Sequence, residues 1–376
     1  MRKAMNLFLL GGLSLLLAAG CDKFGGEQQY SRAEGEPVIF GVTSGAGTKT
    51  AYSGVVTTDG VERINWAKGD DFRIYSDKAV HRYHSDQKWA DYVVTKAATP
   101  DGRYSNAEID NKDTGEKLSN GQPMTNGLVW GAAGTYNFWA VYPAPAETTA
   151  FSTLEGLKLN IPATQDPKET STTDGVTILT PDMANAFMTA VAANITTSDD
   201  TGAPVNLDFE PAFTAFEFTM SSDENTIKLN TVTLESTSMS LAGDFSVSYS
   251  GTTPTYKDEN AADAPSKSIT INLGGQEIAP ATESAAAKTV TFTFLAQPQA
   301  FNDLKISFTI ESNGESQTRS MVLAKDGVGV EFAALKKHIL RGTSMPSELF
   351  KIYYKPQVFT TDEWVEIGET TDLIVM

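Results

Sequence analysis

The sequence has little of what catalytic and metal sites are built from. It holds one cysteine, Cys21, and three histidines, His81, His84 and His338, among 376 residues. A single cysteine cannot form an internal disulfide, so the stability of the fold must come from buried apolar surface. We find no zinc-ligand spacing, no phosphate-binding loop and no glycine fingerprint leading into a helix. The sequence therefore predicts neither an enzyme nor a bound cofactor or metal.

Positive charge is also scarce. The chain has 29 lysines and arginines against 47 aspartates and glutamates, which gives a formal net charge of -18. Nucleic acids and anionic lipid surfaces are bound through clusters of basic side chains, and this chain has no such cluster. We therefore expect no nucleic-acid partner.

A long apolar run occurs only near the start. Arg2 and Lys3 precede the apolar residues 7–17, and the small residues 18–20 lead to Cys21. This is the pattern of a secretory signal, and it is too short for a mature membrane-spanning helix. Cys21 stands where a lipoprotein signal places the residue that becomes acylated. We expect a signal peptide at 1–20 and a lipid anchor on Cys21, which would hold the protein on a membrane, facing away from the cytosol.

No long amphipathic helix can be traced, whereas threonine, serine and glycine are abundant, as in strands and turns. Residues 21–36 have the composition of a flexible tether. Roughly 350 mature residues exceed what one core usually serves, so two domains are expected. Alternating apolar residues at regular spacing predict an all-β fold with one β-sandwich at 37–200 and a second at 201–376.

The first predicted strand, Pro37 to Val42, is a compact apolar run that we call strand A. A glycine-containing segment follows, in which Lys49 lies in the open context that proteases cut. Farther along, residues 64–66 and 72–74 alternate on either side of the turn residues 68–71. These two runs predict a pair of adjacent strands.

Isolated polar residues give no strong sign of chemistry. His81 and His84 are three apart, so on a strand they face opposite sides and would converge on a metal only across a turn. The acidic pairs 70–71 and 199–200 lack the spacing of a calcium loop, so we interpret them as solvated turn residues. Paired carboxylates for glycoside hydrolysis stay open, because their separation depends on the fold.

The five tryptophans fall into two groups. Trp66, Trp139 and Trp364 lie in strand patterns and are expected to pack in a core or an interface. Trp89 and Trp130 have less regular neighbours, and for them contact with a ligand stays open.

Six motifs follow one another along the chain in an order that resembles a known family. They are Cys21, Val38 to Val42 with Thr48 to Thr50, Ile64 to Asp70, Tyr136 to Pro143, Phe213 to Phe218, and Glu363 to Gly368. Together they span almost the whole mature chain. In this order they resemble the fimbrillins, which are pilus subunits exported as lipoproteins in some Gram-negative bacteria.

The resemblance implies two tandem transthyretin-like β-sandwich domains and assembly by strand exchange. In that family a trypsin-like protease removes the first strand, and a C-terminal strand of another subunit fills the groove. Carried onto this sequence, the cut falls after Lys49, although the family more often has arginine there. The donor lies within Ile352 to Ile367, with Trp364, Val365 and Ile367 as its anchors. A cut at Arg32 would release the tether but leave the groove filled.

The resemblance also implies the partners and the location. The partners are other fimbrial subunits, in a homo- or heteropolymer, a trypsin-like processing protease, and the outer membrane through the acylated, palmitate-bearing Cys21. The protein would then move from the outer membrane to the fimbrium, as a shaft, base or accessory subunit, and act in cell adhesion. The alternative is a monomeric surface lipoprotein that binds glycans or host proteins through its loops.

Overall fold

The computed structural model describes residues 32–44, 51–56, 62–97, 105–117, 119, 121, 123–125, 127–145, 157–198, 203–260, 267–325, 327–344, 350–354 and 365–369. Within these ranges the chain is built from strands, with one short 3-10 helix at Met183–Asn185. The prediction of an all-β fold is confirmed. In this part of the chain, no helix has the length and apolar character needed to cross a membrane.

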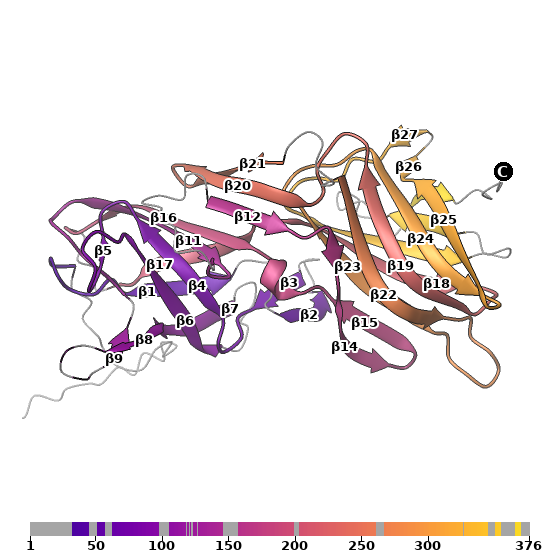
Figure 1. Ribbon diagram of the computed structural model, residues 1–376, viewed down its shortest axis with the longest axis horizontal. Helices are drawn as coiled ribbons and strands as arrows, with labels where there is room; N and C mark the ends of the chain where they lie inside the picture. The colour runs from indigo at the N-terminus through magenta and orange to yellow at the C-terminus, as the bar shows by residue number, and fades with distance from the viewer. Residues whose placement is uncertain are drawn as a thin grey trace, which may run out of the picture.

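A closed seven-stranded barrel forms one end of the molecule (Figure 1). Its neighbouring strands are, in order, β1 (Phe40–Ser44), β17 (Val205–Pro211), β16 (Met188–Thr196), β11 (Thr135–Tyr142), β4 (Asp71–Ser76), β6 (Trp89–Ala97) and β7 (Ser105–Asn111). A sandwich was expected for residues 37–200, but these strands close on themselves, because β1 pairs with both β17 and β7.

Two larger sheets form the other end. The first contains β13 (Thr164–Gln165), β22 (Ser268–Ile278), β19 (Ile227–Ser236), β24 (Leu304–Ser312) and β25 (Glu315–Val322). The second contains β14 (Lys168–Thr173), β15 (Val176–Thr180), β23 (Thr289–Ala296), β18 (Thr214–Ser222), β28 (Lys337–Ser344), β29 (Phe350–Tyr354) and β30 (Val365–Glu369). The sheets pack face to face, with Phe308 of β24 stacked on Phe350 of β29 at 4.7 Å between ring centroids.

Smaller sheets complete the fold. β12 (Leu157–Ile161), β20 (Gly243–Ser250) and β21 (Thr253–Asp258) form a three-stranded sheet beside β11 and β16 (Figure 1). The two-stranded sheets are β2 (Ala51–Val56) with β3 (Glu62–Asn65), β5 (Val80–His81) with β10 (Leu128–Val129), β8 (Asp113–Lys117) with β9 (Pro123–Thr125), and β26 (Ala324–Lys325) with β27 (Val328–Gly329).

The strand pair predicted around residues 64–74 is wrong. β3 pairs with β2, whereas β4 pairs with β6 and β11. The turn between β3 and β4 contains Gly69 at a φ of +96°, and its N–H donates to the carbonyl of Val94 at 2.8 Å. This bond holds the turn against β6, so β4 continues along β6 and not along β3.

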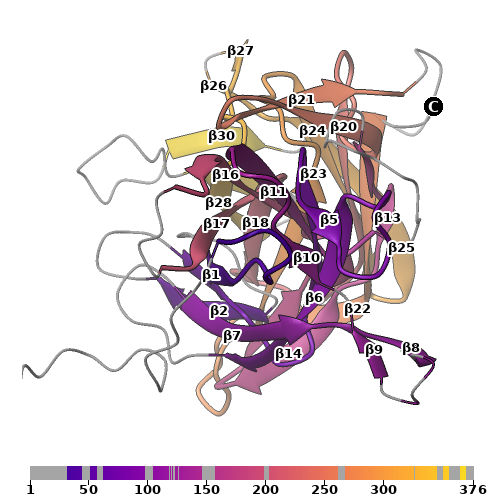
Figure 2. The same ribbon diagram turned by 90° about the vertical axis from the view of Figure 1, so that its left-hand side faces the viewer.

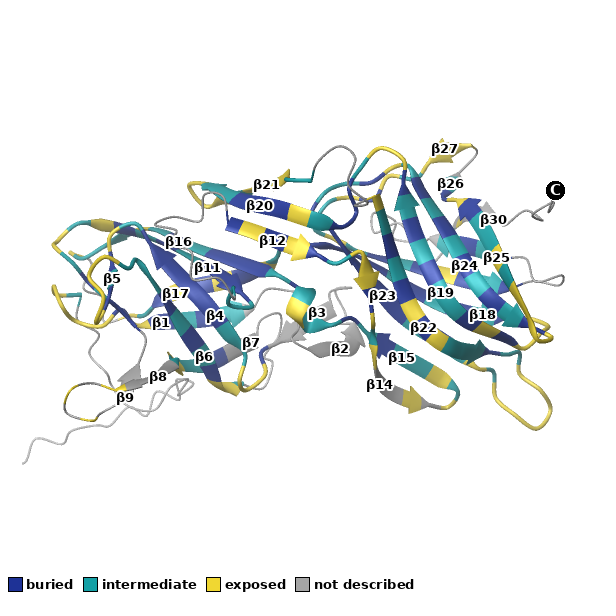
Figure 3. Ribbon diagram, viewed as in Figure 1, coloured by how far each residue is buried: buried dark blue, intermediate teal, exposed yellow. Residues whose placement is uncertain are grey.

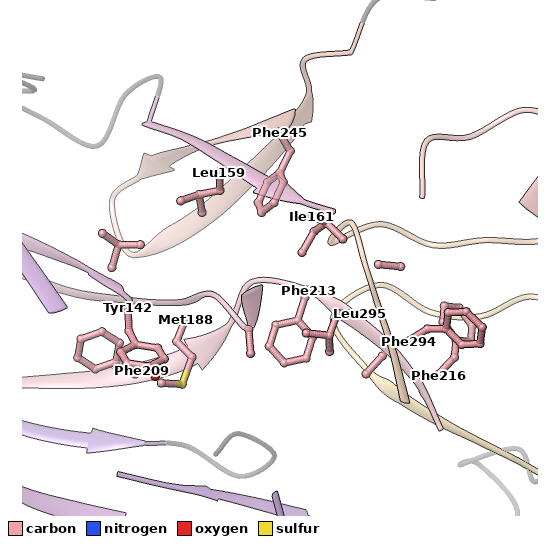
Figure 4. Packing of buried hydrophobic residues seen from close by; sticks show 14 of the residues in the cluster. Tyr142, Leu159, Ile161, Met188, Phe209, Phe213, Phe216, Phe245, Phe294 and Leu295 are labelled. Carbon is pink, nitrogen blue, oxygen red and sulfur yellow. The ribbon is translucent and has the colours of Figure 1, made fainter. Parts of the chain in front are cut away.

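Buried apolar side chains form one cluster that runs from the barrel into the sandwich (Figures 3 and 4). Figure 4 shows Phe209 at the barrel end, Phe213 in the middle, and Phe216 with Phe294 at the sandwich end. Strand pairing also crosses the predicted boundary at residue 200 in both directions. β17 pairs with β1 and β16, while β12, β13 and β15 pair with β20, β22 and β23. The division at 200 stays a prediction.

Candidate functional site

The N-terminal strand β1 is the seam that closes the barrel. It runs parallel to β17, with Val42 opposite Leu207, and antiparallel to β7, with Val42 opposite Ala107. Strand A was predicted at Pro37 to Val42, and the ladder begins three residues later, at Phe40. Pro37 has no N–H to donate, and it lies in an isolated bridge opposite Val129.

Side chains of this segment alternate between the barrel interior and the outside. Val38, Phe40 and Val42 are 3%, 6% and 2% exposed, whereas Ile39 is 37% exposed. This is the period of two expected of an extended chain. Three inward side chains therefore fill the barrel from a segment that belongs to the N-terminal end of the chain.

Phe40 packs against two aromatic rings inside the barrel. Its ring meets Tyr92 at 5.4 Å and Phe138 at 5.2 Å between centroids, both edge to face. The Tyr92 hydroxyl accepts a hydrogen bond from the backbone N–H of Leu128 at 3.0 Å. Burial raises the pKa of Tyr92, so this hydroxyl stays protonated. Without β1, an aromatic trough would be exposed to water between the open edges of β17 and β7.

The C-terminal strands form a hairpin at the edge of the seven-stranded sheet. β29 pairs with β28 on one side and with β30 on the other, and β30 is the last strand in the sheet order. Phe350 and Ile352 of β29 are fully buried. Strand β30 has one strand partner in its sheet, and the ion pair between Lys351 and Glu366, at 3.4 Å, joins it to β29. β29 is therefore part of the sandwich core, whereas β30 lies at the edge of its sheet.

The predicted site residues are only partly within the described chain. Cys21, Lys49 and Trp364 lie outside the described residues. Val365 and Ile367 belong to β30, where the backbone of Val365 is opposite Tyr354. The roles assigned to these residues stay predictions.

The histidine pair lies at a turn and not along one strand. His81 and His84 form an isolated bridge across a turn, and their rings are 4.9 Å apart. The Nδ1 atom of His81 accepts from the backbone N–H of Tyr83 at 3.2 Å. Among the residues that the structure describes, no three His, Cys, Asp or Glu side chains are grouped so as to hold a metal ion.

Two tryptophans left open as ligand contacts are packed against other side chains. Trp130 is 2% exposed and contacts Tyr136 and Phe138 edge to face. Trp89 is covered by the guanidinium of Arg73, whose Cζ lies 3.8 Å from the ring centroid. Arg73 also donates two hydrogen bonds to Asp91, at 2.7 and 3.1 Å.

The two tryptophans expected to pack within the described chain also do so. Trp66 is 2% exposed and packs on Phe72, Tyr142 and Phe209, while Trp139 packs against the core cluster. No residue pattern near Trp130 indicated its burial, because β10 before it is only two residues long.

One charged pair lies on the outer face of the seven-stranded sheet. Lys337 Nζ is 2.6 Å from Glu217 Oε2, and the two side chains are 16% and 22% exposed. Burial raises the pKa of Glu217 to about 7 and lowers the pKa of Lys337 to about 7. A carboxyl group with such a pKa is found in general acids, but here its direct partner is the lysine across the strand pair, which is the arrangement of a structural ion pair.

Comparisons with known proteins find similarity in solved structures. No protein-family model matches the chain, and no curated protein matches it. A proposed cell adhesion protein from Bacteroides ovatus is 15% identical, with a TM-score of 0.45 over 85% of this chain and 96% of that chain. The C-terminally truncated tip fimbrial protein of Porphyromonas gingivalis is 10% identical, with a TM-score of 0.38 over 85% and 98%. A fimbrial assembly protein from Parabacteroides distasonis is 10% identical, with a TM-score of 0.38 over 85% and 95%. The solved structures to which this chain is similar thus include fimbrial and proposed cell adhesion proteins.

Proposed function

We propose that this chain is a fimbrial subunit, exported as a lipoprotein and polymerised when its first strand is exchanged for a C-terminal strand of another subunit. The geometry of β1 carries the proposal. Strand β1 supplies Phe40 and Val42 to the barrel interior and pairs with β17 and β7, and Val38 just before it is buried as well. It leads into residues 45–50, where the predicted cut after Lys49 lies.

The barrel needs β1, or a strand that replaces it, to remain stable. Burying the two large apolar side chains of β1, Phe40 and Val42, is worth about 1.5–3 kcal/mol each, or about 3–6 kcal/mol together. A folded domain is stable by only about 5–15 kcal/mol. A barrel that lost β1 without replacement would give up much of its stability, and the unpaired edges of β17 and β7 would accept another strand.

The C-terminus supplies a donor of the required kind. Deleting β29 would remove Phe350 and Ile352 from the core of the subunit itself. Strand β30 is at the edge of its sheet, so its departure would break one strand pairing in that sheet and not two. We therefore place the donor at the end of the broader range 352–367, where the anchors Trp364, Val365 and Ile367 lie, and not at its start.

Processing followed by polymerisation is the direct test. Purified acylated protein is treated with a trypsin-like protease, and the new N-terminus is identified by mass spectrometry while polymers are followed by electron microscopy. We expect an N-terminus at Thr50 together with polymers. The variant Lys49→Ala should remain monomeric, while the control Lys68→Ala, on an exposed turn lysine, should be cut and polymerise as the parent does.

A truncation tests the donor. The chain ending at residue 364 should be cut normally, melt within a few degrees of the parent, and form no polymer. Polymers of normal length from this truncated chain would refute the donor assignment. An uncut, acylated and monomeric cell-surface form would instead favour a stationary binding lipoprotein.

A further inference from the structure

A second set of contacts, separate from β1, attaches the N-terminal segment to the barrel. Residues 35–38 run antiparallel to residues 128–130. Gly35 N–H donates to Trp130 O at 2.8 Å, Trp130 N–H to Glu36 O at 2.9 Å, and Val38 N–H to Leu128 O at 2.9 Å. Residues 128 and 129 form β10, whose other edge pairs with β5. Both strands lie at the end of the barrel that faces the viewer in Figure 2.

Arg32 adds a further attachment ahead of this ladder. Its Nη1 donates to the carbonyl of Thr196, at the end of β16, at 2.8 Å. Its guanidinium Cζ lies 5.7 Å from the ring centroid of the buried Trp130, within the range of a cation–π contact. The partners of residues 32–38 are therefore residues 128–130 and 196, whereas the partners of β1 are β17 and β7.

We propose that residues 32–38, which we name the clasp, hold the N-terminal peptide on the body of the subunit after the chain has been cut between β1 and β2. We call the rest of the subunit, from residue 51 onward, the body. The clasp surface on the body, made of residues 128–130 and 196, is thus a binding site for the subunit's own cleaved peptide. This inference rests on the proposed function in one respect, namely that a cut occurs in residues 45–50.

The clasp sets the order in which the peptide leaves. A cut after β1 frees the end of the strand at Ser44, while the opposite end stays fixed through Gly35 to Val38 and Arg32. A tethered strand rebinds its groove at a high effective concentration. A replacement strand must therefore displace β1 from Ser44 towards Phe40, and the clasp opens last. Since the peptide would carry the acylated Cys21, the cut subunit stays on the membrane until a replacement strand arrives.

The test separates cutting from exchange. The mature, acylated full-length protein, with the recognition sequence of a specific viral protease inserted between Ser44 and Ala51, is placed on neutral phosphatidylcholine vesicles and cut to completion. Vesicle flotation then measures how much of the body stays bound. We expect the body to remain with the vesicles, and to leave when a synthetic peptide of residues 355–376 is added.

Two results are decisive, and each concerns a different claim. If the body leaves the vesicles on cutting alone, the clasp is refuted, whether or not polymers form. If the body remains bound and the synthetic peptide never releases it, the clasp is supported, and strand exchange by this C-terminal tail is refuted.

A pair of glycine variants gives a matched control. Gly35 has a φ of +83°, and a β-carbon added to it would meet no other atom within 4 Å, so Gly35→Ala strains only the clasp backbone. Gly314, in the hairpin between β24 and β25, has a φ of +82° and the same open space. After cutting and addition of the synthetic peptide, we expect Gly35→Ala and Arg32→Ala each to raise the rate at which the subunit leaves the vesicles by about tenfold. Gly314→Ala should leave that rate unchanged. Equal rates for Gly35→Ala and the parent would overturn the proposal.

Discussion

Replacing Phe40 with alanine tests whether β1 stabilises the uncut subunit and is absent from the polymer. Phe40 is 6% exposed and lies edge to face with Tyr92 and Phe138. Removing a buried phenylalanine ring costs about 3–5 kcal/mol, and less where neighbours can relax into the space. We expect a value near the lower end of this range, about 3 kcal/mol, for the uncut protein.

Urea unfolding of the uncut protein and of the assembled polymer supplies the measurement, with tryptophan fluorescence as the signal. The free energy of unfolding of uncut Phe40→Ala should fall by about 3 kcal/mol, which moves the midpoint by about 1 M urea. Polymer built from the same variant should unfold as parent polymer does, since the strand carrying the substitution has left. The control Ile39→Ala, at a side chain 37% exposed, should cost less than about 1 kcal/mol. An equal loss in uncut protein and polymer would refute strand exchange at β1.

Three further predictions concern the rest of the fold. Burial opposes the charge of Asp303, but hydrogen bonds from residues 236–238 outweigh it and lower the pKa of Asp303 to about 2. Since this value lies below the unfolded one, the carboxylate stabilises the fold above about pH 4 and that gain is lost towards pH 2. In thermal melts, Asp303→Asn should lower the free energy of unfolding by about 1 kcal/mol at pH 7, after allowance for solvent screening, and should leave it almost unchanged at pH 2. Lys337→Met removes the charged partner of Glu217, a carboxyl group whose pKa is raised by burial to about 7. The free energy of unfolding should fall by about 2 kcal/mol at pH 8, where the carboxyl group is charged, and by much less at pH 5, where it is protonated. A pH-independent loss would contradict this. Arg73→Lys keeps the charge but loses the paired hydrogen bonds and the stacking on indole, and should lower the free energy of unfolding by about 1–2 kcal/mol, where an unchanged melt would count against the stacking.

Local patterns in the sequence predicted which residues face inward. The alternating residues 304, 306, 308 and 310 are all fully buried along β24. The apolar run of strand A predicted a strand but not which of its side chains face inward, and Ile39 within it is 37% exposed. Such information is local, because the side chains of a strand alternate whatever its partner is.

Partner choice could not be read in the same way. Nothing in the residues of β1 indicates that β17 will lie beside it, or that β12 will pair with β20. Trp130 packs on Tyr136 and Phe138 of β11, and the approach of His81 to His84 depends on a turn. These contacts arise from the tertiary arrangement, which a single sequence records only weakly.

The parallel pairing of β1 with β17 has a consequence for folding. Thr43 of β1 and its side-chain partner Asp208 of β17 are 165 residues apart in the chain. Closing so long a loop carries a large entropic cost, and contacts of high sequence separation form slowly. During synthesis from the N-terminus, β1 emerges well before β17, so its apolar side chains stay unpaired with that strand until residues 205–211 have been made. Barrel closure at this seam should therefore limit the folding rate, and under the proposed strand exchange the seam that closes last is the one that opens first.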